Sequence, residues 1–208
     1  MILLYGVFLG GTRGVWIGFL AAGTVAVFMA PHLTRQVKTY LLIAGIVVLT
    51  LVSGIVWYTD YHEELLRRST SFRPEIWSTF WNKIITGNTL FGAGANAGSE
   101  IQPGPYVFDH PHNIYVATLY YGGVIGLLLL LAMLAFAIYG ALQLRDPSQR
   151  NLILTCLTFS LIALAFDGDR LLVKVDYSWV LFWLPLAMVL SVRPYEGNRQ
   201  ETSTSKVF

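Results

Sequence analysis

The hydrophobic residues of this chain gather into long runs separated by short polar stretches. Five such runs cover residues 15–29, 40–58, 114–142, 152–166 and 177–192. A helix needs about 20 apolar residues to cross the hydrocarbon core of a bilayer, and these runs come close to that length. The last two have about 16 residues each, so we expect them to borrow flanking residues. The pattern therefore predicts an all-α, polytopic transmembrane protein with about five full spans.

Residues 1–11 form a further apolar segment that is too short to cross the membrane. As a helix it would reach about 16 Å, roughly half of the hydrocarbon thickness. It lacks the positive region and the cleavage site of a signal peptide. We interpret it as a partial N-terminal span whose earlier part is missing. The chain expressed alone is then expected to be inactive or poorly stable without N-terminal spans or a partner subunit.

Composition supports a lipid environment. Hydrophobic residues make up 55% of the 208 residues and charged residues only 12%, about half the charged share of a soluble domain. The net charge of +2 comes without a basic stripe, which argues against nucleic acid as a partner. The single cysteine, Cys156, lies in an apolar run and does not reveal the redox compartment. We therefore predict one membrane domain over residues 1–208.

Loop charges indicate the orientation of this domain. Alternating spans place the long loop 59–113 on one face, and the loops 32–39 and 143–151 with the polar tail 193–208 on the other. Lysines and arginines divide seven against seven between the faces. Four of those on the first face lie in the long loop, where the positive-inside rule gives them little weight. This favours a cytoplasmic tail and an extracytoplasmic long loop.

The long loop itself carries a structured segment. Apolar residues repeat at helical spacing from 73 to 86, and Pro74 suits a first-turn position. The segment is predicted to be an amphipathic helix on or near the membrane surface. A glycine-rich turn follows over 90–98, and its backbone could approach a ligand closely.

The densest cluster of titratable groups lies where the long loop meets the third run. It comprises Asp109, His110 and His112, followed by Asn113. A histidine at a membrane surface could accept a proton from a sugar hydroxyl, and Asp109 could orient one ring. The histidines could equally cap or anchor a helix at the interface. A metal site ranks lower, because no compact zinc-like or EF-hand spacing is present.

Charged residues beside the apolar runs offer a second kind of chemistry. Arg13 lies between glycines at the start of the first run, where it could bind phosphate or extend to lipid headgroups. Arg73 begins the amphipathic helix, and it too could bind phosphate or extend to lipid headgroups. Asp167 ends the fourth run on the face of His112, where it could position a hydroxyl-rich acceptor or hold an arginine. Asp169 and Arg170, which follow it, could form a surface ion pair.

Three elements carry a resemblance to a known family. They are Thr12-Arg13-Gly14 before an apolar run, an Arg73-led helix followed by Leu90-Phe91-Gly92-Ala93-Gly94, and His112-Asn113 separated by nine residues from Gly123-Val124-Ile125-Gly126. The third is the most specific. Together they resemble the O-antigen ligase and O-antigen polymerase superfamily of polytopic membrane glycosyltransferases. The similarity covers nearly the whole chain, although family members usually have about twice this length and additional N-terminal spans.

The resemblance implies a GT-C-like fold and a metal-independent, cofactor-free enzyme in the bacterial inner membrane, with its active site facing the periplasm. The donor would be a glycan on undecaprenyl diphosphate, and the acceptor a sugar hydroxyl of lipid A core or of another glycan. His112, or alternatively His110, would be the catalytic base, while Arg13 and Arg73 would bind the diphosphate. The remaining candidates, which would contact the acceptor or orient other groups, are Asp109, Asn113 and Asp167.

Other functions remain open at this stage. A polymerase that joins repeat units on the same carrier would use the same donor and a similar acceptor. A transporter could also place histidine and arginine within a membrane protein, but no Gly- or Pro-broken pair of spans and no internal repeat is visible in the sequence. The short N-terminal segment leaves an inactive fragment as a third alternative.

Overall fold

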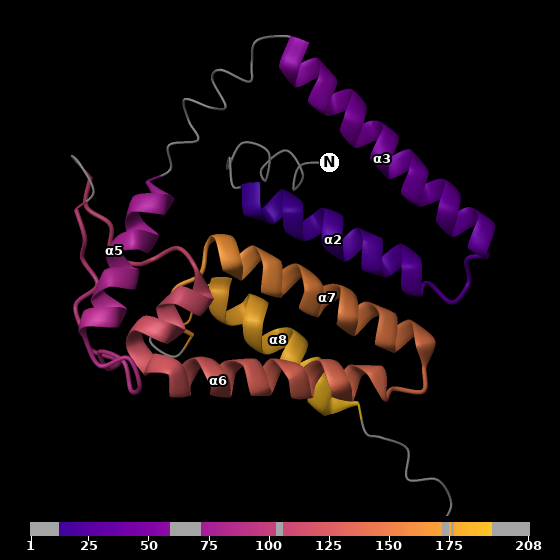
Figure 1. Ribbon diagram of the computed structural model, residues 1–208. Coiled ribbons are helices and arrows are strands. Elements are labelled where there is room, and N and C mark those ends of the chain that lie inside the picture. Colours follow the sequence, from indigo (N-terminus) through magenta and orange to yellow (C-terminus); the bar gives the residue numbers. More distant parts are fainter. Residues whose placement is uncertain (1–12, 59–71, 103–105, 172–174, 176, 193–208) are drawn as a thin grey trace, which may run out of the picture.

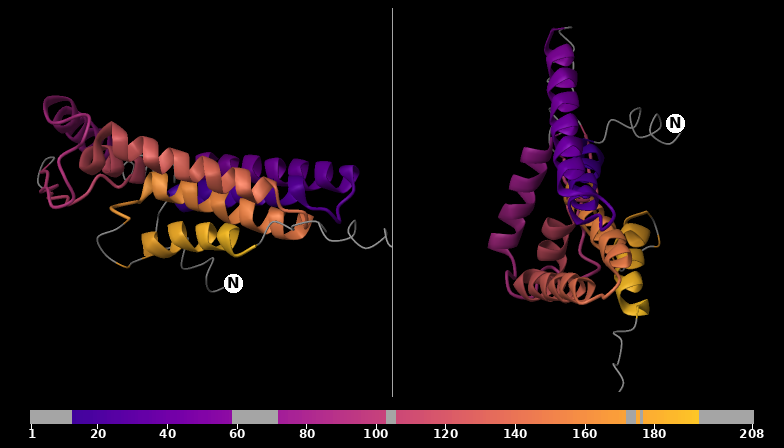
Figure 2. Two further views of the ribbon diagram at one scale, coloured as in Figure 1. Left: turned by 90° about the horizontal axis from the view of Figure 1, so that it is seen from below. Right: turned by 90° about the vertical axis from the view of Figure 1, so that its right-hand side faces the viewer.

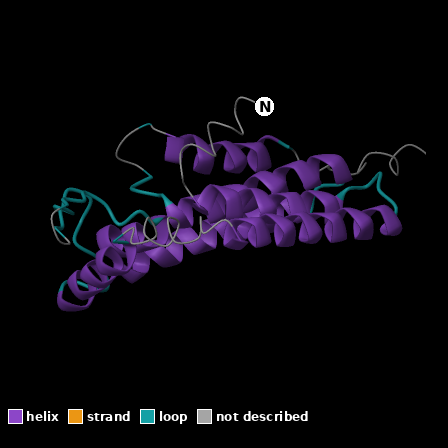
Figure 3. Ribbon diagram, turned by 90° about the horizontal axis from the view of Figure 1, so that it is seen from above, coloured by secondary structure: helices purple, strands orange, loops and turns teal. Residues whose placement is uncertain are grey.

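The described part of the chain is helical. A computed structural model of the protein describes residues 13–58, 72–102, 106–171, 175 and 177–192. Within them lie α2 (Arg13–Met29), α3 (Arg35–Tyr58), α5 (Arg73–Thr86), α6 (Ile114–Leu142), α7 (Pro147–Phe166) and α8 (Tyr177–Ser191) (Figure 1). The described residues between these helices form loops and turns, with an isolated bridge between Ile101 and Phe108 as the β pairing in this part (Figure 3). The prediction of an all-α fold is therefore confirmed.

Each apolar run of the sequence corresponds to one helix, although the last run extends one residue beyond α8. The helices α5 and α6 have the predicted bounds, whereas α7 begins five residues before the apolar run. Its earlier start follows from a cap, because the Asp146 side chain accepts a hydrogen bond from Ser148 N and Pro147 occupies the first turn. By length and composition α6 and α7 could cross a membrane, and 14–29 and 177–191 are shorter apolar helices. Segments 1–11 and 193–208 lie outside the described residues.

Small residues bring α2 and α7 together. Gly14, Gly18 and Ala22 are buried and follow one another at four-residue spacing, so they lie on one face of α2. A Cβ atom on Gly14 would lie 2.1 Å from the Phe166 Cβ atom, and one on Gly18 would lie 3.2 Å from the Phe159 ring. This is the small-residue packing typical of membrane helices. It places the first turn of α2 against the last turn of α7.

The main apolar core lies between α6, α7 and α8. These three helices run side by side, and α2 covers the other side of α7 (Figures 1 and 2). The core includes Leu134 and Ala141 of α6, Leu157 of α7 and Leu186 of α8. In contrast, α3 packs mainly against α2 and exposes many apolar side chains between Val37 and Leu51. Such an exposed apolar surface is typical of a helix that faces lipid.

The long helix α6 is broken at Gly123, whose φ of 64° and ψ of −165° are non-helical. The glycine-rich turn fills the break. Val124 N donates to Thr89 O and Ile125 N to Leu90 O, while Ala93 N donates to Tyr120 O and Gly94 N to Tyr121 O, at 2.8–3.2 Å. The turn thus satisfies backbone groups that a continuous helix would pair internally. A break in a span was not expected from the sequence.

The break divides α6 into two parts with different neighbours. Residues 124–142 form a rod of about 28 Å, close to the hydrocarbon thickness. Residues 114–122 instead pack against α5, whose Ile76, Phe80 and Ile84 are buried against Ala117 and Tyr120. The other side of α5 exposes the polar residues Glu75 and Asn82 as well as the apolar residues Trp81 and Ile85, and the position of this helix at the membrane surface stays a prediction. This second, smaller core fixes the start of α6 and the loop before it.

Candidate active site

The loop carrying the two histidines is held in place from several sides. Pro111 is fully buried, and its carbonyl accepts a hydrogen bond of 2.9 Å from the Trp77 indole of α5. The Asn113 side chain caps α6 by accepting from Tyr115 N at 2.9 Å and Val116 N at 3.1 Å. Asn113 was predicted as a possible acceptor or orienting residue, and in the structure its side-chain oxygen serves as a helix cap. These contacts make His110 and His112 part of a fixed surface.

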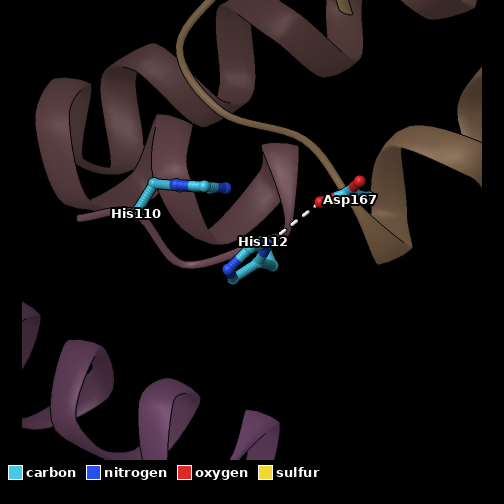
Figure 4. Close-up of side chains that lie close together, drawn as sticks. All are labelled: His110, His112 and Asp167. Carbon is cyan, nitrogen blue, oxygen red and sulfur yellow. Dashed lines mark hydrogen bonds and ion pairs between the residues drawn. The ribbon is translucent and has the colours of Figure 1, made fainter. Parts of the chain in front are cut away.

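His112 forms a hydrogen-bonded pair with Asp167. Its Nδ1 atom lies 2.9 Å from Asp167 Oδ1, although the two residues are 55 positions apart (Figure 4). Asp167 follows the last residue of α7, and the next residue, Gly168, lies against Ile114. A Cβ atom on Gly168 would come within 2.9 Å of the Ile114 Cβ atom. Glycine at this position therefore allows the end of α7 to meet the start of α6.

Backbone conformation also marks this region. Among the described residues, the non-glycine residues with positive φ are His112 at 50° and Phe72 at 44°. Left-handed backbone costs about 1–2 kcal/mol for a residue with a side chain. His112 belongs to the cluster of titratable groups, and Phe72 directly precedes Arg73. Unfavourable conformations of this kind concentrate at functional sites, because the surrounding structure must hold them.

The Asp167 carboxyl group is suited to remain ionised. Its hydrogen bond with His112 lowers its pKa below the usual value, and this outweighs the opposing effect of burial; Tyr177 and the nearby histidines lower it further. An ionised carboxylate accepts the Nδ1 proton of His112 and so leaves Nε2 as the ring atom that can take up a proton. The pair thus has the orientation of a general base with its positioning carboxylate.

His110 lies beside this pair but has a different partner. Its Nδ1 atom is 2.6 Å from Asp109 Oδ1, and the centroids of the two histidine rings are 3.9 Å apart. The Asp109 side chain is 81% exposed, whereas that of Asp167 is 32% exposed. Asp109 therefore orients His110, and the more buried carboxylate orients His112.

The same side chains could also hold a cation. Ligand atoms of His110, His112 and Asp167 lie within 4.8 Å of one another. A metal ion at His112 Nδ1 would take the place of the proton that now joins this ring to Asp167. The preference for a metal-free base over a metal site stays a prediction.

The two predicted phosphate-binding arginines lie at helix starts near this cluster. Arg73 is half-buried at the start of α5, four residues before Trp77, so both lie on one face of that helix. Arg13 is the first residue of α2, and the neighbouring Gly14 touches Phe166, which directly precedes Asp167. The Arg13 side chain lies outside the described residues, as do Arg67 and Arg68. Convergence of both arginines with His112 on one cavity stays a prediction.

Asp169 and Arg170 form the ion pair that the sequence suggested, although it is only partly exposed. The Arg170 guanidinium lies over the Tyr121 ring at 4.8 Å, and its Nη1 donates to Ala95 O at 3.2 Å. Its Nε atom is 3.7 Å from Asp169 Oδ1, and the Asp169 side chain is only 13% exposed. The residues after α7 are thereby attached to both the glycine-rich turn and α6.

Taken together, the described helices define a membrane-type helical protein with titratable side chains gathered at one end. The chain belongs to the O-antigen ligase family, because the family model described as O-antigen ligase matches residues 1–131. The matched range includes His112 and both candidate arginines but ends before Asp167. The resemblance seen in the sequence is therefore confirmed.

A curated relative supports this assignment. Over 146 residues the chain is 33% identical to a protein of Pseudomonas aeruginosa named O-antigen ligase, a stretch that covers 69% of this chain and 36% of the relative. The chain thus spans only about a third of the relative's length. No solved structure matches the chain.

Proposed function

We propose that this protein acts in O-antigen ligation, transferring a glycan from an undecaprenyl-diphosphate carrier to a sugar hydroxyl of lipid A core. Family membership supports the class of reaction. The observation that carries the assignment of residues is the His112–Asp167 pair at the end of an apolar helical bundle. Its polar end corresponds to the face predicted to be periplasmic, and the reaction would take place there.

In this mechanism His112 is the general base. Its Nε2 atom takes the proton of the acceptor hydroxyl while the hydroxyl oxygen forms a bond to the anomeric carbon of the donor. The bond from that carbon to the phosphate oxygen breaks, and the diphosphate departs with the electron pair. Attack opposite the leaving group inverts the anomeric configuration. Asp167 keeps the ring oriented and stabilises the imidazolium that forms, and the chemistry needs no metal.

The leaving diphosphate requires positive charge. Arg73 would supply it together with the start of α5, where Phe72 provides no side-chain cap and the first-turn N–H groups add partial positive charge. The second arginine would be Arg13, whose neighbour Gly14 packs against Phe166, the residue before Asp167. Positive groups that act on charge as it develops stabilise the transition state more than the ground state.

The test is glycan transfer by purified variants of the protein. His112→Ala should abolish transfer but leave donor binding nearly intact, because a base acts in the transition state. His32→Ala is the matched control, since His32 is an exposed histidine in the loop before α3. Arg73→Ala should weaken donor binding as well as turnover, and Arg73→Lys should restore them only in part.

Several results would contradict this proposal. Retained transfer in His112→Ala with loss in His110→Ala would move the base to His110. Elongated glycan on the carrier, with none on lipid A core, would identify a polymerase. Transport of the glycan across a vesicle membrane without transfer would exclude an enzyme.

A further inference from the structure

The side chains of His110, His112 and Asp167 bring three metal-ligand groups close together. Their ligand atoms all lie within 4.8 Å of one another. Figure 4 shows the His110 ring extending toward the other two side chains, with a nitrogen at its tip. The three side chains are 22%, 25% and 32% exposed, so an ion can reach them from solvent although they are partly buried. Two imidazoles and one carboxylate form a set of ligands that favours zinc and related transition metals.

The hydrogen bond between His110 and Asp109 prepares the His110 ring to bind a metal ion. Its Nδ1 atom lies 2.6 Å from Asp109 Oδ1. An ionised carboxylate accepts the Nδ1 proton, which leaves the lone pair of the ring on Nε2. Histidine ligands commonly bind a metal through one ring nitrogen while the other donates to a carboxylate, and this bond orients the ring and makes it a stronger ligand. Asp109 is suited to that supporting role, and with Asp167 it supplies negative charge to balance a divalent cation.

The backbone holds the three ligands in nearly the spacing that zinc requires. Pro111, between the two histidines, is fully buried, and Gly168, after Asp167, packs against the start of α6. A tetrahedral zinc ion with ligands at about 2.0–2.2 Å places its ligand atoms about 3.3–3.5 Å from one another. His112 Nδ1 and Asp167 Oδ1, at 2.9 Å, are already within this spacing. Because no separation exceeds 4.8 Å, side-chain movements of about 1.5 Å at most complete the site.

Other possible ligands do not form a comparable group. Among the described residues, this cluster is the one in which three His, Cys, Asp or Glu side chains gather their ligand atoms so closely. Cys156 instead lines an apolar pocket between α2, α7 and α8, and no histidine or carboxylate shares that lining. The positive charge of Arg170, three residues after Asp167, is offset by its ion pair with Asp169. The cluster is therefore the place in the described part of the chain that best accommodates a divalent cation.

We propose that His110, His112 and Asp167 bind Zn²⁺ and that the bound ion inhibits the protein. At His112 the ion occupies Nδ1 in place of the proton shared with Asp167, and the ring then carries its proton on Nε2. That nitrogen can no longer accept a proton from a hydroxyl group. A water molecule would complete the tetrahedral coordination. The inhibition rests on the proposed function, because it removes the catalytic base, whereas the binding of the ion does not.

The first experiment measures Zn²⁺ binding to the purified protein, isolated through a tag without histidine. Competition with a chromophoric zinc chelator gives the affinity, and excess Mg²⁺ should not displace the ion, because Mg²⁺ prefers oxygen ligands in octahedral geometry. His110→Ala and Asp167→Asn should each lower the Zn²⁺ affinity at least about tenfold, and Asp109→Asn should lower it about ten- to hundredfold. His32→Ala, at an exposed histidine outside the cluster, is the matched control and should leave the affinity unchanged.

Thermal unfolding should confirm that each variant is folded. Where His110→Ala does not fold, His110→Gln keeps a polar side chain and still removes the imidazole ligand. Co²⁺ bound to the wild-type protein should give the visible absorption of a tetrahedral site with nitrogen and oxygen ligands, and His110→Gln should lose this absorption. Unchanged Zn²⁺ affinity in folded variants of both His110 and Asp167 would overturn the metal site.

The second experiment measures glycan transfer at increasing concentrations of free Zn²⁺. Transfer should fall by half near the dissociation constant measured for Zn²⁺, and an added chelator should restore it. A requirement of transfer for Zn²⁺ would overturn both the inhibition and the metal-free mechanism. If Zn²⁺ bound to the cluster but left transfer unchanged, the role of His112 as the base and the inhibition would fail, and the metal site would stand. Loss of transfer in His112→Ala with unchanged Zn²⁺ affinity in the ligand variants would overturn the metal site and leave the proposed function standing.

Discussion

Gly123→Ala tests whether the glycine-rich turn holds the broken helix. A Cβ atom at this position would lie 2.3 Å from Leu90 O and 2.5 Å from Gly92 N, both backbone atoms of the turn, and the residue has φ of 64°. The turn would have to retreat, because a distance under 3.0 Å is essentially never seen for a real Cβ atom. Four backbone hydrogen bonds between the turn and α6 would then lengthen.

The expected loss of stability follows from these contacts. Alanine with φ of 64° and ψ of −165° would occupy a region that essentially only glycine adopts, at a cost of about 1–3 kcal/mol, and each hydrogen bond lost costs a net of about 0.5–1.5 kcal/mol. Loss of two of the four bonds gives about 2–6 kcal/mol in total. The unfolding temperature in detergent should drop by several degrees, and residues 87–98 should become sensitive to limited proteolysis. Transfer should fall by up to about 10²-fold, because the turn and the start of α6 position the site.

The neighbouring glycine provides the control. A Cβ atom on Gly122 meets nothing within 4 Å, and its φ is not positive, so Gly122→Ala should change stability by less than about 1 kcal/mol. If Gly123→Ala had the same unfolding temperature and protease resistance as Gly122→Ala, the turn would not be docked in the break, and the reasoning would be refuted.

Three further substitutions probe the site. In Asp167→Asn, the stability lost relative to the wild type should be constant from neutral pH down to about pH 5 and shrink below about pH 4. The reason is that a carboxyl group with a lowered pKa in the folded state stabilises the fold above its unfolded-state pKa, and this stabilisation is lost as pH falls through its folded-state pKa. Thermal unfolding across pH measures this, and a difference largest at low pH would contradict it. Asn113→Ala should cost about 0.5–2 kcal/mol through loss of the α6 cap, whereas Asn113→Asp should retain it in the same thermal assay. Trp77→Phe removes the hydrogen bond to Pro111 O and should lower the rate of transfer about tenfold and the free energy of unfolding by about 1 kcal/mol. An unchanged rate would show that this hydrogen bond does not position the histidines.

The helices could be predicted because a membrane-spanning helix requires a recognisable apolar sequence. Apolar runs long enough to cross a bilayer must be continuous, so the bounds of α6 follow from composition alone. The periodic apolar residues of α5 likewise gave its limits. The break at Gly123 could not be found in this way, since a glycine in an apolar run looks the same whether its backbone is helical or not. The break at Gly123 depends on its hydrogen bonds with the glycine-rich turn, which lies about thirty residues earlier in the chain.

The candidate site was predictable as a set of residue types but not as a set of pairs. His112 and Asp109 are neighbours in sequence, so Asp109 was considered as the orienting carboxylate for one of the histidines. The left-handed backbone at His112 instead accompanies a bond to Asp167, while Asp109 pairs with His110. Such a pairing depends on how α6 and α7 meet, which is decided by Gly168 against Ile114. Local spacing carries no information about that contact.

The break in α6 has a mechanical consequence. Hydrogen bonds from the glycine-rich turn reach the helix on both sides of Gly123, so the two parts of α6 are joined as a rigid elbow and not as a flexible hinge. A bilayer that is thicker or thinner than the rod of residues 124–142 would change the tilt of that rod. Because the two parts of α6 are joined rigidly, residues 114–122 and the histidine loop before them would move with it. If the proposed transfer takes place at this loop, its rate should therefore depend on lipid acyl-chain length and so on membrane thickness.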